Sequence, residues 1–218
     1  MKIAVMGTGM VGDAIGSKLI SLGHSVMMGS RTKNNEKALA FVSKNSDNAS
    51  EGTFAEAARF GEIIFNCTKG EHSLDALKSA GDALNGKILV DIANPLDFSQ
   101  GMPPTLLPAL SNSNSLGEEI QKAFPDTKVV KTLNTMWNGL MVNPNLIGNG
   151  DHINYICGND ADAKSKVISI LNEVGWKKEN ILDLGDISAA RGTEGYLPLW
   201  LRIYGATGSG AFNFKLVK

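Results

Sequence analysis

Glycines near the amino terminus have the spacing of a phosphate-binding turn. The apolar run Lys2–Met6 predicts a strand, and Gly7, Gly9 and Gly12 follow it in a Gly-x-Gly-x-x-Gly pattern that opens a helical stretch. In this pattern the first glycine permits a tight turn, the second lets the backbone approach a pyrophosphate, and the third lets the helix pack closely on the strand. The free N–H groups and the positive dipole end of the helix would hold the phosphate charge. The residues therefore predict a dinucleotide site, and the alternative is a strand–helix turn with a purely structural role.

The residues after the second predicted strand, Ser25–Met28, favour NADP over NAD. An NAD-specific site usually has Asp or Glu there, to accept hydrogen bonds from the ribose 2′-hydroxyl. This chain has Ser30 and Arg31 instead, followed by Thr32 and Lys33, so no carboxylate repels a 2′-phosphate. The planar guanidinium of Arg31 matches phosphate oxygens, and Lys33 adds a second positive charge. A solvated basic turn is the alternative interpretation.

No residue stands out as a catalytic acid or base. His72 could act near a nicotinamide or simply begin a helix, and Lys131 ends an expected strand, where we expect it to face solvent. Asn94 and Asn134 could bind a carboxamide or serve as turn residues. If two redox cofactors exchange a hydride directly, the protein needs only to stack one ring on the other and exclude water. A chain with an NADP site and no evident acid or base is consistent with that chemistry.

Length and composition predict one α/β domain with a modest extension. The 218 residues are enough for a full core, and the net charge of −1 gives no reason to expect nucleic-acid or membrane partners. Met1 leads directly into the first predicted strand, so we expect no targeting presequence and a cytoplasmic location. Cys67 and Cys157 are expected to be reduced and structural. The scattered histidines predict no metal site.

Predicted strands alternate with predicted helices along the chain. The expected strands after the second one are Ile63–Asn66, Lys87–Asp91, Lys128–Lys131, Asn154–Cys157 and Ile181–Asp183. The expected helices after the first one are Glu36–Val42, Thr53–Phe60, Ser73–Leu84, Ser115–Phe124, Ala161–Val174 and Ala189–Tyr204, with a long loop over 97–114 and an extended Phe212–Leu216 at the end. This alternation predicts a Rossmann-type, doubly wound α/β fold, with a mostly parallel sheet, helices on both faces and a small C-terminal α/β extension.

The expected domain boundary lies near Asn143. Residues 1–143 would form the NADP-binding Rossmann domain, and residues 144–218 a small C-terminal extension that closes the pocket. Ligands of such folds bind at the carboxyl ends of the strands, so the segments that follow the strands are the expected site. The predicted cofactor-binding residues are Gly7, Thr8, Gly9, Met10, Val11, Gly12, Ser30, Arg31, Lys33, Cys67, Thr68, His72, Ala93, Asn94, Pro95, Leu133, Asn134 and Thr135.

Over essentially its whole length the chain resembles the F420H2:NADP oxidoreductase family, which includes the cytosolic reductase domain of STEAP metalloreductases. The matching motifs are the glycine turn, the Gly29–Arg31 ending of the second strand, Glu71-His72, Gly86–Pro95 and Val129–Asn134. The resemblance implies that NADPH lies along the strand ends and that the deazaflavin F420, or a flavin such as FMN or FAD, stacks on the nicotinamide. It also implies a homodimer, to which the C-terminal tail contributes.

The resemblance also implies a role for individual residues. Thr8, Ser30, Arg31 and Lys33 would hold the adenosine end and the phosphates, Thr68, Ala93 and Asn94 would lie nearer the nicotinamide, and Leu133, Asn134 and Thr135 would border the second ring. F420-using members have His-Thr, an apolar residue and a proline at this last position, whereas this chain has Asn134-Thr-Met-Trp137. The departure counts against F420 as the second cofactor more than it counts against NADP.

Two other functions remain open. The first is an NADP-dependent dehydrogenase or imine reductase of a small metabolite, because related N-terminal domains serve such enzymes. Those enzymes usually have a larger helical C-terminal domain, and the segment after Pro144 here is short and of mixed strand and helix. The second is a non-catalytic NADP sensor, in which occupancy changes a partner contact.

Overall fold

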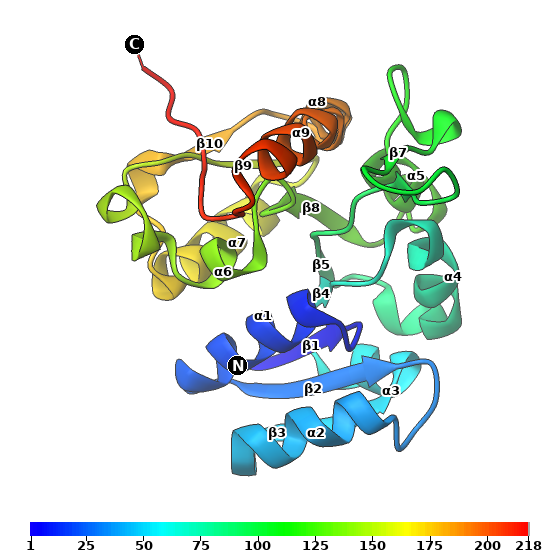
Figure 1. The fold of residues 1–218 in the computed structure, drawn as a ribbon. Helices are drawn as coiled ribbons and strands as arrows, with labels where there is room; N and C mark the ends of the chain where they lie inside the picture. The colour runs from blue at the N-terminus through cyan, green and yellow to red at the C-terminus, as the bar shows by residue number, and fades with distance from the viewer. Residues whose placement is uncertain (218) are drawn as a thin grey trace.

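An eight-stranded sheet forms the middle layer of the molecule (Figure 1). The structure is a computed structural model that describes residues 1–217, with Ser46 described by its backbone alone. The strands lie in the order β10-β9-β8-β5-β4-β1-β2-β3, and β6 and β7 form a separate two-stranded sheet. The strand bounds are β1 Lys2–Met6, β2 Ser25–Ser30, β3 Ala49–Thr53, β4 Ile63–Asn66, β5 Ile88–Asp91, β6 Leu96–Asp97, β7 Thr105–Leu106, β8 Lys128–Thr132, β9 Asn154–Gly158 and β10 Ile181–Asp183.

The strand directions confirm the predicted fold class. The strands from β3 across the sheet to β8 are all parallel to their neighbours, in the order β3-β2-β1-β4-β5-β8. This is the strand order of the doubly wound dinucleotide-binding fold. β9 then pairs antiparallel with β8, and β10 pairs parallel with β9. The sheet is therefore mostly parallel, and the carboxyl ends of its parallel strands meet at one edge.

Helices cover both faces of the sheet. Their bounds are α1 Met10–Ser21, α2 Glu36–Asn45, α3 Phe54–Phe60, α4 Gly70–Ala80, α5 Leu116–Ala123, α6 Asn138–Val142, α7 Ala161–Val174, α8 Ala190–Gly195 and α9 Leu197–Thr207. Short 3-10 turns lie at η1 Ser46–Asn48, η2 Gly81–Leu84, η3 Pro108–Leu110, η4 Pro144–Leu146, η5 Gly148–Gly150, η6 Lys178–Asn180 and η7 Ile187–Ala189.

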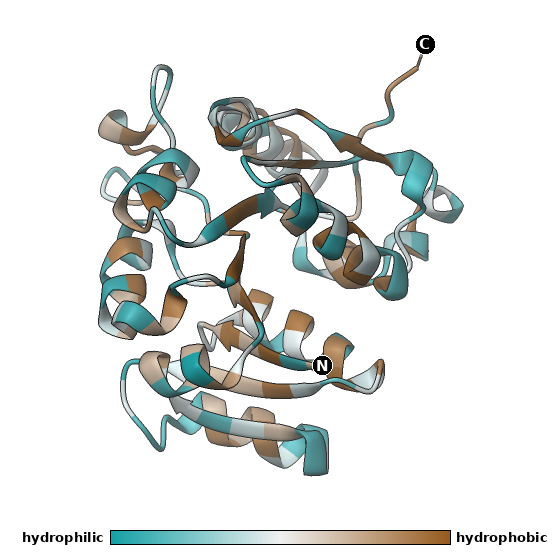
Figure 2. Ribbon diagram, turned by 180° about the vertical axis from the view of Figure 1, so that it is seen from behind, coloured by the Kyte–Doolittle hydropathy of each residue, from teal (hydrophilic) through white to brown (hydrophobic). Residues whose placement is uncertain are grey.

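Alternate residues of each central strand contribute to two separate cores. In β1, Ile3 and Val5 pack with α1, α2 and α7 on one face, whereas Ala4 and Met6 pack with α3, α4 and α5 on the other. Figure 2 shows brown, hydrophobic residues along the central strands and mixed teal and brown along the covering helices. Because both faces are covered, the central strands are continuous apolar runs in the sequence, which is why they were predictable.

The structure differs from the expected elements in several places. Helix α6 was not expected, and the expected helix Ser73–Leu84 begins earlier, as α4 Gly70–Ala80, and ends in the turn η2. Residues Ala49–Thr53, which carry no apolar pattern, form the edge strand β3 beside β2. The expected loop over 97–114 contains one strand of a short hairpin, β7, and the turn η3. The expected helix Ala189–Tyr204 is divided into α8 and α9, because Pro198 has no N–H to continue the helical hydrogen bonding from one to the other.

The segment after Asn143 continues the same sheet through β9 and β10. The terminal residues then run alongside the chain just before β9, where Ile153 donates its N–H to the carbonyl of Phe214 at 2.8 Å. The Asn213 amide donates to the carbonyl of Ile153 at 2.9 Å, and Lys215 pairs with Asp151. Residue 218, the last of the expected extension, lies outside the described residues.

Within residues 1–217, no helix combines the length and the apolar character needed to cross a bilayer.

Candidate functional site

Two of the three fingerprint glycines are required by the packing of the protein itself. Gly7 has a φ of 117°, and a Cβ placed on it would lie 2.6 Å from the carbonyl oxygen of Cys67. A Cβ on Gly12 would lie 1.9 Å from the carbonyl oxygen of Gly7. A Cβ on Gly9, by contrast, would meet no atom within 4 Å. Protein packing therefore explains Gly7 and Gly12, and leaves open space at Gly9, where the fingerprint brings a pyrophosphate close to the backbone.

The start of α1 fits a bound phosphate. Gly9 is its N-cap residue, and no side chain caps the helix. The first-turn N–H groups of a helix have no partner inside the helix, so they are available to an anion. Asp13, the acidic residue of this turn, is paired with Lys44 at 2.8 Å, which offsets its repulsion of an anion. The residues present therefore fit the phosphates of a dinucleotide.

The basic turn after β2 presents one uncommitted guanidinium. Arg31 is exposed, and across residues 1–217 its side chain makes neither a hydrogen bond nor an ion pair. Lys33 is paired with Glu56 at 2.7 Å, and this ammonium together with Thr53 lowers the pKa of Glu56 to about 2. Ser30 is buried and its hydroxyl donates to the carbonyl of Thr32. Arg31 is thus the side chain of this turn best placed for a 2′-phosphate.

The segments after β4, β5 and β8 meet beside the glycine turn. The side-chain amide of Asn94 donates to the carbonyl of Asn134 at 2.8 Å, and the Asn134 amide donates back to Asn94 Oδ1 at 2.9 Å. A Cβ on Gly70 would lie 2.0 Å from the carbonyl oxygen of Asn94, so the first residue of α4 abuts this pair. The predicted residues after these strands are therefore brought together at one edge.

The turn after β8 contains two unusual residues. Leu133 has a φ of 61°, a left-handed conformation that a leucine adopts only under the constraint of its surroundings, and its side chain is buried. The hydroxyl of Thr135 is also buried, and it has no hydrogen-bond partner among the described residues. An orphaned buried hydroxyl is costly, so Thr135 is a candidate contact for a bound ligand.

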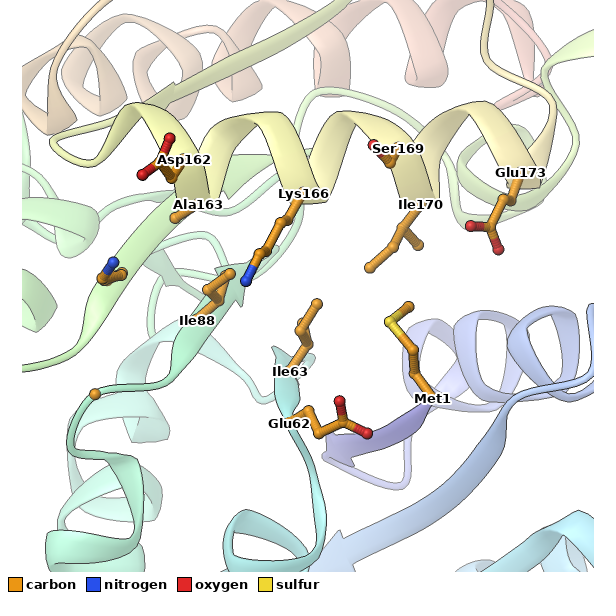
Figure 3. Close-up of a pocket in the computed structure, with 12 residues that line it drawn as sticks. Met1, Glu62, Ile63, Ile88, Asp162, Ala163, Lys166, Ser169, Ile170 and Glu173 are labelled. Carbon is orange, nitrogen blue, oxygen red and sulfur yellow. The ribbon is translucent and has the colours of Figure 1, made fainter.

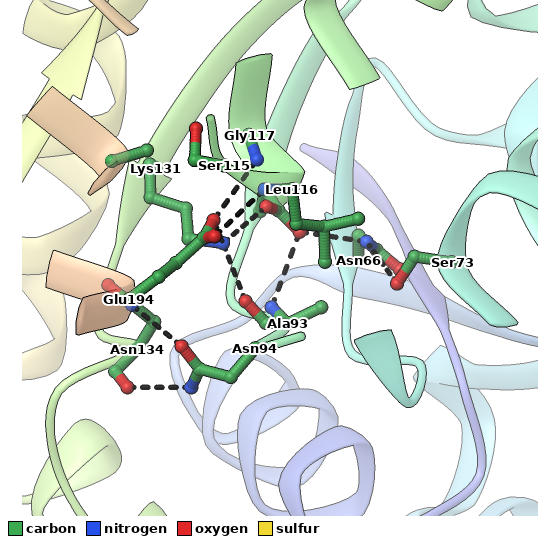
Figure 4. A network of polar contacts seen from close by, with 12 residues as sticks. Asn66, Ser73, Ala93, Asn94, Ser115, Leu116, Gly117, Lys131, Asn134 and Glu194 are labelled. Carbon is green, nitrogen blue, oxygen red and sulfur yellow. Dashed lines mark hydrogen bonds and ion pairs between the residues drawn. The ribbon is translucent and has the colours of Figure 1, made fainter. Parts of the chain in front are cut away.

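Lys131 is completely buried, and our expectation of a solvent-facing lysine was wrong. Its Nζ lies 2.7 Å from both Asp91 Oδ2 and Glu194 Oε1, and it also donates to the carbonyl of Ala93 (Figure 4). The cause is the register of the sheet, which places Lys131 opposite Asp91 on adjacent strands, and α8 brings Glu194 over them. We call Asp91, Lys131 and Glu194 the charge triad.

The sequence reasoning missed Asp91 and Glu194. Two predicted apolar strands each end in a charged residue, Asp91 in one and Lys131 in the other. These opposite charges were the signal in the sequence that could have predicted a buried ion pair. Nothing in the short polar run around Glu194 marks it as buried.

Burial opposes the charge on Lys131, but the two carboxylates outweigh it and hold the pKa of the ammonium above its usual value. Burial raises the pKa of Glu194, against the opposing attraction of Lys131.

A chain of hydrogen bonds joins the triad to the turn after β4 (Figure 4). Asn66 donates to Asp91 Oδ1 at 2.8 Å, and the Thr68 hydroxyl donates to Asn66 Oδ1 at 2.7 Å. The Ser73 hydroxyl lies 2.7 Å from that of Thr68. The floor of the candidate site is therefore one continuous polar network beneath Thr68, Ala93 and Asn94.

The remaining candidates lie away from this network or are chemically inert. His72 is exposed on the first turn of α4, 3.6 Å from Glu71. Cys67 and Cys157 are free thiols, and burial raises the pKa of both, that of Cys157 to about 12. Neither is a thiolate at neutral pH. Within residues 1–217, no cluster of three or more His, Cys, Asp or Glu side chains could hold a metal ion.

A hollow of about 350 Å³ lies at the opposite edge of the sheet (Figure 3). It is bordered by Met1, Ile63 and Ile88 at the amino ends of β1, β4 and β5, and by Lys166 and Ile170 of α7. None of the fingerprint or strand-end residues reaches it. Ligands of doubly wound sheets bind at the carboxyl ends of the strands, so the glycine edge, and not this hollow, is the candidate cofactor site.

The fold and this edge define a dinucleotide-binding Rossmann protein. Residues 2–95 match the family model described as NADP oxidoreductase, coenzyme F420-dependent. A solved structure from Arthrobacter sp. FB24, named provisionally as an F420-dependent NADP reductase, is 47% identical, covers 100% of both chains and has a TM-score of 0.94. The chain belongs to this family of F420-dependent NADP oxidoreductases.

Two curated proteins are similar to this chain. The F420-dependent NADP reductase of Methanocaldococcus jannaschii is 28% identical over 223 residues, which cover 96% of this chain and 96% of that protein. The metalloreductase STEAP3 of Rattus norvegicus is 31% identical over 206 residues, which cover 91% of this chain. The match spans only 38% of the metalloreductase, so the likeness concerns one part of that protein.

Gly9→Ala tests whether the glycine turn is a pyrophosphate site. Because the new Cβ meets no protein atom within 4 Å, the free energy of unfolding should fall by no more than about 1 kcal/mol, the loss of a good N-cap residue. Isothermal titration should nevertheless show NADPH binding weakened on the order of ten-fold, because the methyl group occupies the space of close backbone approach.

Gly12→Ala is the matched control for this substitution. Its Cβ overlaps the Gly7 carbonyl oxygen, so it should lower the free energy of unfolding by about 1–3 kcal/mol. Wild-type NADPH affinity in Gly9→Ala would show that no pyrophosphate approaches this turn.

Proposed function

We propose that this protein binds NADP(H) along the carboxyl edge of its sheet and transfers a hydride between NADP(H) and a deazaflavin, F420, or a flavin. The observation that carries the proposal is the open space at Gly9 beside a helix start that no side chain caps. The uncommitted guanidinium of Arg31 supports NADP as the dinucleotide. Family membership supports hydride transfer as the reaction.

The proposal assigns separate tasks to the segments of the edge. The turn over Gly7–Gly12 would hold the pyrophosphate, and Arg31, with Ser30 and Lys33 beside it, the 2′-phosphate. Thr68, Ala93, Asn94 and Pro95 would border the nicotinamide, and Leu133, Asn134 and Thr135 the second ring. The bound cofactors would supply the hydride chemistry themselves. The protein would orient the two rings and exclude water from between them.

The state of Lys131 favours this proposal over a metabolite dehydrogenase. A ketone or imine reductase needs a group that gives or takes a proton at the substrate. An ammonium group has three N–H donors, and those of Lys131 have Asp91, Glu194 and the Ala93 carbonyl as acceptors. No donor is left over for a substrate. Exposed His72 is the remaining candidate acid on this edge, and it lacks the buried partner that would orient it.

The acceptor is proposed from the relatives. The Arthrobacter and Methanocaldococcus proteins are both named for F420, and they cover nearly the whole of this chain. The Asn134-Thr-Met-Trp137 segment departs from the family pattern at the second ring, so a flavin remains the alternative acceptor. The test below has two other outcomes: the acceptor is a small metabolite, or there is no acceptor, as in a sensor.

We also propose that the protein is a homodimer and that residues 144–218 close the pocket. α9 is apolar around much of its circumference, yet Leu199 is 52% exposed and Tyr204 is exposed as well. The neighbouring tail exposes Phe214 and Leu216. Exposed apolar side chains on α9 and on the neighbouring tail support a subunit interface. On the inner side, Gly210 packs so close to Trp137 that a Cβ would lie 2.9 Å from its ring, which supports closure by the tail.

Arg31→Glu should weaken NADPH binding far more than NADH binding. The substitution removes a charged donor and adds a charge that repels the 2′-phosphate, so the Kd for NADPH should rise on the order of 100-fold. The Kd for NADH, measured by the same titration, should change by less than about three-fold, because NADH has no 2′-phosphate to lose contact with. Arg59→Glu, the same change at an exposed arginine of α3, should alter neither. Equal weakening of both cofactors would contradict the assignment of Arg31.

The acceptor is found by following NADPH oxidation, under nitrogen, with F420, FMN and FAD offered one at a time. We expect turnover with F420 or, failing that, with a flavin. A small ketone and a cyclic imine serve as comparison substrates in the same assay. Turnover with these alone would replace the proposal by a metabolite reductase. Tight NADPH binding without oxidation by any acceptor would replace it by a sensor.

Leu199→Glu should convert a dimer into a monomer, because it puts a charge into the proposed apolar interface. Sedimentation equilibrium of the wild-type protein should give the dimer mass, and that of the variant the monomer mass. Leu146→Glu is the matched control, since Leu146 is also 52% exposed but lies on η4. A monomeric wild-type protein, or a variant that stays dimeric, would overturn the proposed interface.

A further inference from the structure

The charge triad has one more negative than positive charge and is almost completely buried. The side chains of Asp91 and Lys131 are 0% exposed, and that of Glu194 is 1% exposed. Among residues 1–217, these are the only Asp, Glu, Lys or Arg residues that are buried. The cluster is therefore the principal fixed charge in the interior of the protein.

Hydrogen bonding requires both carboxylates to be ionised. Asp91 accepts from Asn66 and the N–H of Ala93 on one oxygen and from Lys131 on the other. Glu194 accepts from Lys131 and the N–H of Gly117 on one oxygen, and from the N–H of Leu116 on the other at 2.8 Å. All of these partners are donors, so a proton on either carboxyl group would find no acceptor among them. The net charge of the triad is accordingly −1.

The environment reduces this charge but does not cancel it. The first-turn N–H groups of α5 contribute a positive dipole end at Glu194, equivalent to roughly half a charge. On the helices that adjoin the triad, Glu118 of α5 and Arg191 of α8 neutralise each other as an ion pair. A net negative charge therefore remains beneath the strand ends.

The triad is joined by one or two hydrogen bonds to Ala93 and Thr68, which are proposed to border the nicotinamide. Lys131 and Asp91 hold the backbone of Ala93 from both sides, at its carbonyl and its N–H. Asn66 joins Asp91 to Thr68. Thr68, Ala93 and Asn94 form the wall of the proposed nicotinamide site, so the charge acts on a ring at that wall through protein and not through bulk water.

We propose that the charge triad makes the site bind NADP⁺ in preference to NADPH, and so lowers the reduction potential of the bound couple. The proposal rests on the proposed function, because it requires the nicotinamide at this wall. The oxidised nicotinamide ring carries a positive charge that the reduced ring lacks, so a fixed negative charge stabilises only the oxidised form. The protein would thereby favour loss of the hydride from NADPH to the acceptor.

Glu194→Gln and Lys131→Met should change the cofactor preference in opposite directions. The readout is the ratio of the Kd for NADP⁺ to the Kd for NADPH, measured by isothermal titration without any acceptor. Glu194→Gln neutralises the triad and should raise the ratio on the order of ten-fold, the effect of one charge at roughly 10 Å with an effective dielectric constant of about 20. Lys131→Met leaves two carboxylates and should lower the ratio by a similar factor at alkaline pH, where both carboxyl groups are ionised.

The opposite signs separate an electrostatic role from a structural one. Loss of a merely structural contact weakens both cofactor forms alike and leaves the ratio unchanged, whatever happens to thermal stability. Lys131→Met leaves buried carboxylates unpaired and can fail to fold. In that case the test uses Glu194→Gln and Asp91→Asn, and both should raise the ratio. Glu118→Gln is the matched control, an identical change in the partly exposed pair with Arg191, and should not alter the ratio.

The outcomes distinguish this inference from the proposed function. A wild-type protein that binds neither NADP⁺ nor NADPH overturns both. A wild-type protein that binds both forms, with a ratio that Glu194→Gln and Asp91→Asn leave within about two-fold of its original value, overturns the electrostatic role of the triad and leaves the proposed function standing.

Discussion

The burial of one ammonium group constrains the whole carboxyl edge of the sheet. Lys131 gives up its hydration, and a buried charge is tolerated only when good geometry and further hydrogen bonds compensate it. Its acceptors come from the end of β5, the segment after it and α8. Glu194 in turn accepts from the first turn of α5, 78 residues earlier in the chain. Removing any one of these groups leaves another charge uncompensated, so the four segments hold one mutual arrangement, and this arrangement is the floor of the candidate site.

Glycines bring the strand-end turns together above this floor. Gly7 abuts the backbone of Cys67 after β4, and Gly70 abuts the backbone of Asn94 after β5. A side chain at either position would separate consecutive turns, because the nearest atoms are main-chain atoms that cannot swing away. Gly9 makes no such contact. Close packing among the turns, with open space at Gly9, is the arrangement that the proposed dinucleotide site requires.

The sequence predicted most of the fold, because buried parallel strands are continuous apolar runs and amphipathic helices have a clear period. The helix Ala161–Val174 and the strand Ile181–Asp183 have their predicted bounds. Ala49–Thr53 escaped prediction because an edge strand of polar residues has no such run. The environment of Lys131 escaped prediction for another reason. Strand pairing sets it opposite Asp91, and the distant α8 covers both, and neither fact is encoded in the local pattern.

The hydrogen bonding of Lys131 also limits how this family could change its hydride acceptor. On the proposed function, the floor of the site is a closed network whose hydrogen-bond donors are already occupied. Altering the floor to suit a different hydride acceptor would therefore disturb buried charges. The opposite wall has no such constraint. Trp137 is 40% exposed, and its ring packs against Gly210 of the tail. The departure of this chain from the family pattern falls on that wall, at Asn134–Trp137. Selection for a different second ring would therefore act on the wall and tail, and leave the charged floor and the glycine turn unchanged.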